Sequence, residues 1–83
     1  MHALSLYSSG YEGVSGVKIV RETLTELGLA HTLINCANGS INREKLIARK
    51  GFFDVPFLID PNTNTELFDA KDIVRYLEAT YTI

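Results

Sequence analysis

The side chains best suited to chemistry lie close together near the N-terminus. Residues 7–17 carry hydroxyl groups interspersed with glycines: Tyr7, Ser8, Ser9, Tyr11 and Ser15 with Gly10, Gly13 and Gly16. A hydroxyl can polarise a neighbouring group through a hydrogen bond, and a glycine-rich loop before a helix can offer backbone N–H groups to an anion. No Gly-Lys-Ser/Thr follows the glycines, so the segment does not match a P-loop. Because loop serines also serve turns and helix caps, both interpretations stay open.

Cys36 is the only cysteine of the chain. A single cysteine forms neither an intrachain disulfide nor a cysteine metal cage, so we expect no metal site. It ends an expected strand, and we expect a small buried residue, distant from the start of the first helix.

The composition bounds the class of protein. Its 83 residues, 46% of them hydrophobic, suffice for one domain, residues 1–83, with a single core. The net charge of −2 argues against a nucleic-acid partner. The basic residues gather only at Arg43, Lys45, Arg49 and Lys50, which we expect to form a solvated helix face. Since no signal peptide or membrane-length apolar run is recognisable, we expect no membrane partner and a cytoplasmic location.

The first half of the chain predicts two strands that alternate with two helices. Residues 2–7 and 31–36 are the expected strands. Apolar residues at helical spacing predict a helix that starts near Val17 and ends at Gly28. Ser40 is the expected N-cap of a second helix, which runs through Lys50 and ends at Gly51.

The second half predicts a hairpin and a last helix. Residues 55–60 and 65–68 are the expected strands, joined by the turn-forming residues 60–64. Asp69 is the expected side-chain cap of the last helix. The order β-α-β-α-β-β-α predicts an α/β, thioredoxin-like fold. A right-handed crossover makes the first two strands parallel, and we expect the hairpin to add two strands antiparallel to them. The four-stranded mixed sheet would carry helices on both faces.

Three segments, taken in order and spacing, resemble a known family. They are KIVRETLTELGL at 18–29, DVPFLIDPNT at 54–63 and ELFDAKDIVRYLEATY at 66–81, about half of the chain. The chain resembles glutaredoxins and, more closely, the N-terminal domain of glutathione S-transferases. The resemblance implies that Val55 pairs its backbone with the cysteine of glutathione and that Pro56 is a cis-proline.

The resemblance also locates a degenerate reactive motif. Val14, Ser15, Gly16 and Val17 stand where glutaredoxins have Cys-Pro-Tyr-Cys. Thiol–disulfide exchange requires a thiolate, which valine cannot supply, so we expect no redox catalysis at this position.

Some transferases instead hold the glutathione thiolate with a serine or tyrosine hydroxyl. Ser15 lies one residue after the position that would match a catalytic serine, and Ser9 and Tyr11 are further candidates. Tyr7 and Ser9 are only roughly placed for this role.

The remaining glutathione contacts are altered as well. Where the family commonly has Glu-Ser before the last helix, this chain has Asp69-Ala70, which lacks the carboxylate-binding hydroxyl. Asp54 stands where relatives often carry Lys or Gln, and Glu12 where glutaredoxins favour a basic residue. Glutathione is anionic, so these carboxylates disfavour it. We expect glutathione to be at most a weak ligand of a groove formed by Val55, Pro56, Asp69 and Ala70.

These observations leave three hypotheses. The first is a redox-inactive binding or interaction module, whose partner is an unknown protein or a small thiol peptide. The second is a glutathione-dependent enzyme, of transferase or oxidoreductase type, that uses a loop serine or tyrosine in place of cysteine. The third is a structural domain that docks on a larger protein. The absence of C-x-x-C favours the non-catalytic interpretation.

Overall fold

Seven elements follow one another in the predicted order. The computed structural model describes residues 1–9 and 16–82. The elements are β1 (Leu4–Ser8), α2 (Val17–Glu26), β2 (His31–Asn35), α3 (Ile41–Lys50), β3 (Phe57–Asp60), β4 (Thr65–Phe68) and α4 (Ala70–Tyr81). The thioredoxin-like β-α-β-α-β-β-α fold is therefore confirmed. The third strand starts two residues later than predicted, at Phe57, so Val55 and Pro56 precede it.

The four strands form one mixed sheet in the order β2-β1-β3-β4. β1 and β2 are parallel, as the crossover through α2 requires. β3 runs antiparallel to β1, and β4 runs antiparallel to β3. Our prediction that both hairpin strands oppose the first pair is wrong for β4, because a strand antiparallel to β3 must run in the direction of β1.

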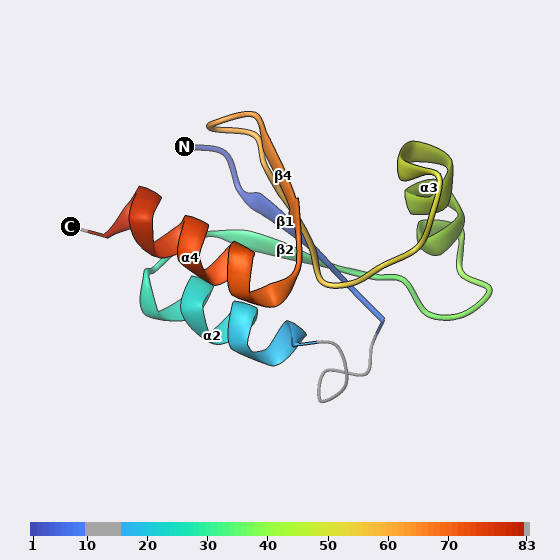
Figure 1. Cartoon of the computed structure of the whole chain (residues 1–83), viewed down its shortest axis with the longest axis horizontal. Helices are drawn as coiled ribbons and strands as arrows, with labels where there is room; N and C mark the ends of the chain where they lie inside the picture. Colours follow the sequence, from blue (N-terminus) through green and yellow to red (C-terminus); the bar gives the residue numbers. More distant parts are fainter. Residues whose placement is uncertain (10–15, 83) are drawn as a thin grey trace.

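Helices cover both faces of the sheet unequally. On one face, Leu4, Leu6 and Leu58 pack against the buried sides of α2 and α4, which lie next to each other (Figure 1). On the other face, Phe57 packs with Leu46 of α3 and with Cys36. None of the helices in the described ranges is long and apolar enough to cross a membrane.

The helix ends follow local sequence signals. The Ser40 hydroxyl accepts a hydrogen bond from the Arg43 N–H at 3.2 Å, the expected N-cap of α3. Gly51 ends that helix with φ +86°, a conformation that favours glycine. These signals act within one helical turn, so they can be read from the sequence alone.

The basic residues of α3 lie at the surface, as expected: Lys45 and Arg49 are exposed, and Arg43 and Lys50 are partly exposed. Three of them also have partners that the sequence did not indicate. The Arg43 guanidinium lies 3.8 Å from the centre of the Phe53 ring, and its Nε donates to the Cys36 carbonyl at 3.2 Å. Arg49 and Lys50 both pair with Glu66 of β4, a segment that only the fold brings to this helix.

A buried carboxylate at the end of β3 joins the sheet to α4. Asp60 is fully buried at the end of β3 and accepts hydrogen bonds from the hydroxyls of Tyr76 and Tyr81. Its other oxygen accepts from the Asn62 backbone N–H at 2.9 Å and from the Asn62 side chain at 3.0 Å. Asn62 in turn exchanges two hydrogen bonds with the His2 backbone, at 2.8 and 2.9 Å. We call these five residues the Asp60 network.

The hydrogen bonds of the Asp60 network determine the ionisation of the Asp60 carboxyl group. Burial disfavours the carboxylate, but the hydrogen bonds from Tyr76, Tyr81 and Asn62 outweigh it and hold the pKa of Asp60 below its ordinary value. Burial and the neighbouring Asp60 raise the pKa of Tyr81 to about 12. The network is thus built for an ionised Asp60 and a neutral Tyr81.

We predict that Asp60→Asn lowers the free energy of unfolding by about 2 kcal/mol at pH 7, because a buried charged acceptor of several hydrogen bonds is lost. Urea denaturation measures the change. Asp72→Asn is the control, since Asp72 is exposed and its ion-pair partner, Arg75, lies 3.8 Å away. The free energy of unfolding of this variant should change by less than about 0.5 kcal/mol. Equal effects of the two substitutions would contradict a structural role for Asp60.

We also predict that the free energy of unfolding decreases at alkaline pH because of Tyr81. Its pKa is raised from 10.0 to about 12 on folding, so its stabilising contribution is complete below pH 10 and is lost as the pH rises toward 12. Tyr81→Phe should therefore make the fall in unfolding free energy over this pH range shallower. The unmodified protein is the reference. If Tyr81→Phe shows the same slope as the unmodified protein, Tyr81 does not titrate as described.

Candidate functional site

Three chain segments meet at one edge of the sheet. Tyr7, near the end of β1, pairs with Phe57 at the start of β3, and Phe57 pairs with Phe68 at the end of β4. The residues that follow β1, precede β3 and follow β4 are therefore neighbours. We call this region the site edge and define it by Ser9, Gly16, Val55, Asp69 and Ala70.

Val55 and Pro56 form the middle of the site edge. The Val55–Pro56 peptide bond is cis. Pro56 is buried, Val55 is half-buried and Asp54 is exposed. β3 begins only at Phe57, so the backbone of Val55 lies outside the strand pairing of the described residues. An extended ligand can therefore pair with the Val55 backbone.

Asp69 has an unusual backbone conformation at the start of α4. Its φ is +72° with ψ 118°, and its carbonyl accepts the first helical hydrogen bond, from Ile73 N–H at 3.0 Å. Its side chain makes no capping hydrogen bond, so our prediction of a side-chain cap is wrong. With positive φ the residue occupies the N-cap position through its backbone, and the exposed carboxylate is left for solvent or a ligand. Such sparsely populated conformations are typical of functional sites.

The starts of α2 and α4 touch at Gly16 and Ala70. Gly16 has φ +77°, and a Cβ added to it would lie 2.8 Å from the Ala70 Cβ. Contacts this short do not occur between real Cβ atoms, so only glycine fits here. The approach brings two helix N-termini, and with them two sets of unpaired N–H groups, to the same edge of the sheet.

The structure describes only two of the four residues at the degenerate C-x-x-C position. Val14 and Ser15 lie outside the described residues, as do Tyr11 and Glu12. Gly16 is the N-cap residue of α2, and Val17 is fully buried in the core beneath α2 and α4. Ser9 is half-buried, directly after β1.

Cys36 is the small buried residue that we predicted. It directly follows β2, and its N–H donates to the Ser8 carbonyl at 2.6 Å, beside the end of β1. The thiol is fully buried against Leu46 and Phe57, on the face of the sheet opposite α2 and α4. Burial raises the pKa of Cys36, an effect that Arg43 partly offsets, so the thiol is a poor nucleophile.

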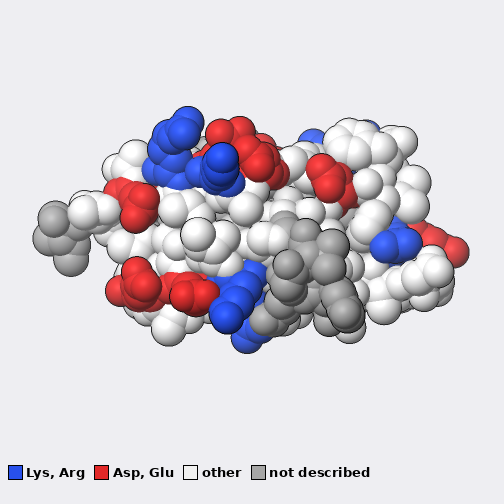
Figure 2. Space-filling view, turned by 60° about the horizontal axis from the view of Figure 1, so that its bottom comes forward, with Lys and Arg blue, Asp and Glu red and all other residues white. Residues whose placement is uncertain are grey.

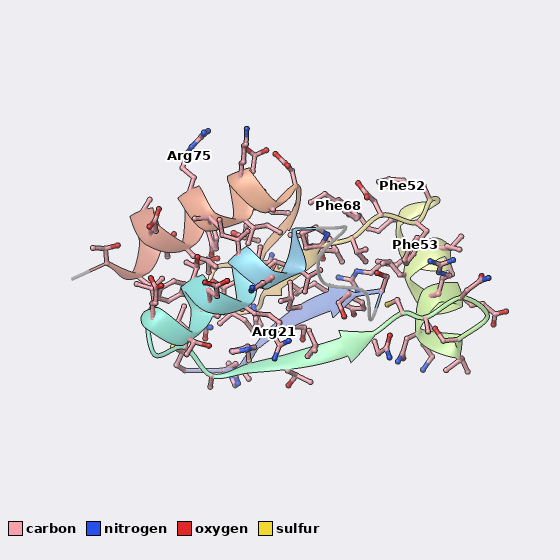
Figure 3. All side chains as sticks on the ribbon, turned by 90° about the horizontal axis from the view of Figure 1, so that it is seen from below. Arg21, Phe52, Phe53, Phe68 and Arg75 are labelled. Atoms are coloured by element: carbon pink, nitrogen blue, oxygen red, sulfur yellow. The ribbon has the colours of Figure 1, made fainter. Side chains whose placement is uncertain are left out.

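A row of aromatic rings beside the site edge was not anticipated. The Phe57 and Phe68 rings stack with centroids 4.4 Å apart, and Phe52 adds a third ring 5.0 Å from Phe68. Figure 3 shows Phe52, Phe53 and Phe68 together at the end of the molecule that carries α3. The spacing of these residues along the chain gives no periodic signal. The pairing of Phe57 with Phe68 follows from hairpin register, which the sequence suggested only through the turn at 60–64.

Within the described part of the chain, no group of three or more His, Cys, Asp or Glu side chains could hold a metal ion. The site edge instead offers backbone groups, two helix starts and the exposed carboxylates of Asp54 and Asp69. This arrangement suits an extended ligand held mainly through its main chain.

A family model described as "Glutathione S-transferase, N-terminal domain" matches residues 11–82, which include the whole site edge except Ser9. The comparison with curated proteins found no match.

Solved structures with the same fold come from several organisms. Glutathione S-transferase isozyme E7 of Drosophila melanogaster is 23% identical with a TM-score of 0.74, over 95% of this chain and 35% of that protein. A Nu-class transferase of Haemonchus contortus is 21% identical with a TM-score of 0.75, over 98% and 37%. A glutathione transferase homologue of Sulfitobacter, solved with bound glutathione, is 19% identical with a TM-score of 0.74, over 98% and 38%. This chain thus spans little more than a third of these proteins.

We predict that Gly16→Ala destabilises the domain more than the same change at the other end of α2. Gly28 also has positive φ, +67°, but an added Cβ there has nothing within 4 Å. Gly28→Ala should cost about 1 kcal/mol from the backbone alone, and Gly16→Ala about 1–2 kcal/mol more from the clash with Ala70. Thermal or urea unfolding compares the two variants. Equal costs would mean that the contact between the helix starts is not tight.

Proposed function

Because the chain belongs to the family of glutathione S-transferase N-terminal domains, we propose that it is a redox-inactive binding module. Its ligand is a small thiol peptide or an extended segment of a partner protein, taken at the site edge. The proposal rests on the two positions at which thiol chemistry could take place. Val17, at the position of the second motif cysteine, belongs to the core, and the single thiol of Cys36 is buried on the opposite face. Neither position supplies an accessible thiolate.

The Val55 backbone supports an extended ligand. Strand addition requires main-chain N–H and C=O groups that are not already paired within the sheet. Val55 lies before the first paired residue of β3 and is half-buried, which lets a ligand contact it without rearrangement of the sheet. The helix starts at Gly16 and Asp69 add N–H groups that favour a carboxylate on the ligand.

The side chains around the Val55 backbone disfavour the binding of glutathione. Asp54 directly precedes Val55, and Asp69 directly follows Phe68, the register partner of Phe57. Both carboxylates are exposed, and neither forms a hydrogen bond or ion pair within the described residues. Ala70 offers no hydroxyl to a ligand carboxylate. Glutathione carries a net negative charge, so each acid weakens its binding by a fraction of a kcal/mol up to about 1 kcal/mol.

A glutathione-dependent enzyme is the second candidate function. It is favoured by the Sulfitobacter homologue, which has the same fold and was solved with glutathione bound. In this chain Ser9 is the described hydroxyl candidate at the site edge, and it would have to hold the glutathione thiolate by a hydrogen bond. The two candidates differ in glutathione affinity and in the effect of removing that hydroxyl.

We predict a glutathione dissociation constant in the millimolar range or above, equivalent to about 4 kcal/mol or less of binding free energy. The double variant Asp54→Gln/Ala70→Ser should bind about tenfold more tightly, because it removes one repulsive charge and adds one hydrogen bond to a carboxylate. A two-dimensional NMR titration that follows the amides of Val55 and Asp69 measures both constants.

The matched control is Glu78→Gln/Ala79→Ser, which makes the same chemical changes near the other end of α4 and should leave the affinity unchanged. Micromolar binding by the unmodified protein, with turnover that Ser9→Ala abolishes, would favour the enzyme. Turnover of a mixed glutathione disulfide that Cys36→Ser abolishes would instead assign the chemistry to the buried thiol. If neither protein binds glutathione, the site edge takes a different ligand.

A further inference from the structure

The turn between β2 and α3 carries a reactive dipeptide that the proposed function does not use. Asn38 and Gly39 are its central residues, and the Ser40 N–H closes it by donating to the Ala37 carbonyl at 2.9 Å. Both central residues are exposed, and Gly39 has φ +80°. The turn projects from the end of the molecule that carries α3 (Figure 1), where Figure 2 shows basic and acidic side chains amid uncharged surface.

The side-chain amide of Asn38 has a defined orientation. Its Oδ1 accepts a hydrogen bond from Arg43 Nη1 at 3.2 Å. A guanidinium can only donate, so the oxygen faces Arg43, and the amide nitrogen has no hydrogen-bond partner among the described residues. The Gly39 N–H also donates to no acceptor within residues 1–9 and 16–82. The amide carbon is therefore polarised by a cation, and neither nitrogen is held by another group of the described chain.

We infer that Asn38 is a site of spontaneous deamidation and that Arg43 binds the carboxylate that the reaction produces. The Gly39 backbone nitrogen attacks the Asn38 side-chain carbon Cγ and forms a C–N bond with it. The bond from Cγ to Nδ2 breaks, and ammonia leaves with the proton that the Gly39 nitrogen gives up. Glycine offers this nitrogen with the least steric hindrance, because it has no Cβ.

Water completes the reaction by opening the five-membered succinimide ring at either of its two carbonyl groups. Addition at Cγ gives aspartate. Addition at the main-chain carbonyl gives isoaspartate, in which the chain continues through the side chain. Neither step changes an oxidation state, so water is the only co-reactant.

The other asparagines of the chain lack these features. The N–H groups that follow Asn35 and Asn42 already donate hydrogen bonds, at 2.6 Å to a carbonyl and at 3.2 Å to a hydroxyl. Asn62 and Asn64 precede threonines, whose branched Cβ hinders an attack by the backbone nitrogen. The Asp60 network also holds the side-chain amide of Asn62. Asn38 is therefore the asparagine that we expect to react.

The carboxylate that replaces the Asn38 amide lies beside a cation whose position is fixed. The Arg43 guanidinium contacts the Phe53 ring, 3.8 Å from its centre, and its Nε donates to the Cys36 carbonyl at 3.2 Å. These contacts keep Nη1 directed at residue 38. The change converts a hydrogen bond to a neutral amide into an ion pair, which is the stronger interaction. Aspartate thus fits the existing turn, whereas isoaspartate lengthens its main chain by one methylene group.

Mass spectrometry of tryptic fragments measures the reaction after incubation of the unmodified protein at 37 °C and pH 8. We expect fragment 22–43 to gain about one dalton, with the change located at Asn38. Fragment 51–71 contains Asn62 and Asn64 and is the internal reference, which should deamidate about tenfold more slowly or less. A sample digested without incubation gives the background. The rate should rise with pH, because the attacking nitrogen must lose its proton.

A matched pair of glycine variants tests the attacking nitrogen. Gly39→Ala should slow deamidation of Asn38 about tenfold, because the added Cβ hinders the nitrogen. Gly51→Ala is the control and should leave the rate unchanged. The two glycines have similar φ, +80° and +86°, and an added Cβ has nothing within 4 Å at either position, so the backbone cost of the two variants is alike.

Asn38→Asp imitates the aspartate product and tests the role of Arg43. The equilibrium constant of unfolding should fall about two- to fivefold, as for an exposed ion pair. In an Arg43→Gln background the same substitution should give no such decrease, and the difference between the two backgrounds isolates the pair. Urea denaturation of the four proteins measures it.

The proposal is overturned if Asn38 of the unmodified protein deamidates no faster than Asn62 and Asn64, a comparison that needs no variant. Equal rates in Gly39→Ala and Gly51→Ala would also overturn it. An equal effect of Asn38→Asp with and without Arg43 would show that the arginine does not bind the product. None of these measurements involves glutathione or the site edge, so their outcome is independent of the proposed function.

Discussion

The arrangement of the site edge depends on the close approach of α2 to α4 at Gly16 and Ala70. Two helices must share one face of a small sheet, over the same three leucines of β1 and β3. They run in the same direction with their first turns in contact, and this contact requires the absence of one methyl group. The consequence reaches beyond packing, since both helix starts then converge beside the Val55 backbone. A domain with a bulkier residue at position 16 would have to separate the helices and would open its core.

The parts of this fold that sequence alone predicts are those decided within a few residues. Ser40 and Gly51 delimit α3, and the turn residues before Thr65 mark the hairpin, because hydrogen bonds in these motifs join near neighbours in the chain. Contacts with a partner that is remote in the chain were not predicted. Arg43 and Glu66 look like ordinary surface charges until the fold brings an aromatic ring and two cations to them.

The candidate site shows the same division. Family resemblance led directly to Val55, Pro56 and the Asp69-Ala70 pair, because these positions lie in matched segments. The positive φ of Asp69 and the contact at Gly16 are properties of the assembled sheet edge and leave no trace in residue types alone. Cys36 illustrates a further difficulty, because strand alternation decides which face a side chain joins. Its backbone reaches the end of β1 while its sulfur lies in a separate core.

The Asp60 network has a consequence for how this domain can be joined to other polypeptides. It ties His2, close to the first residue, and Tyr81, close to the last described one, to a single carboxylate at the end of β3. Both ends of the chain therefore leave the molecule on one side (Figure 1), while the site edge lies at the opposite ends of the same strands. A protein fused before or after this domain would therefore lie on the side away from the site edge. The site edge would stay unobstructed, and tension applied through the two ends would be transmitted to the hydrogen bonds of Asp60.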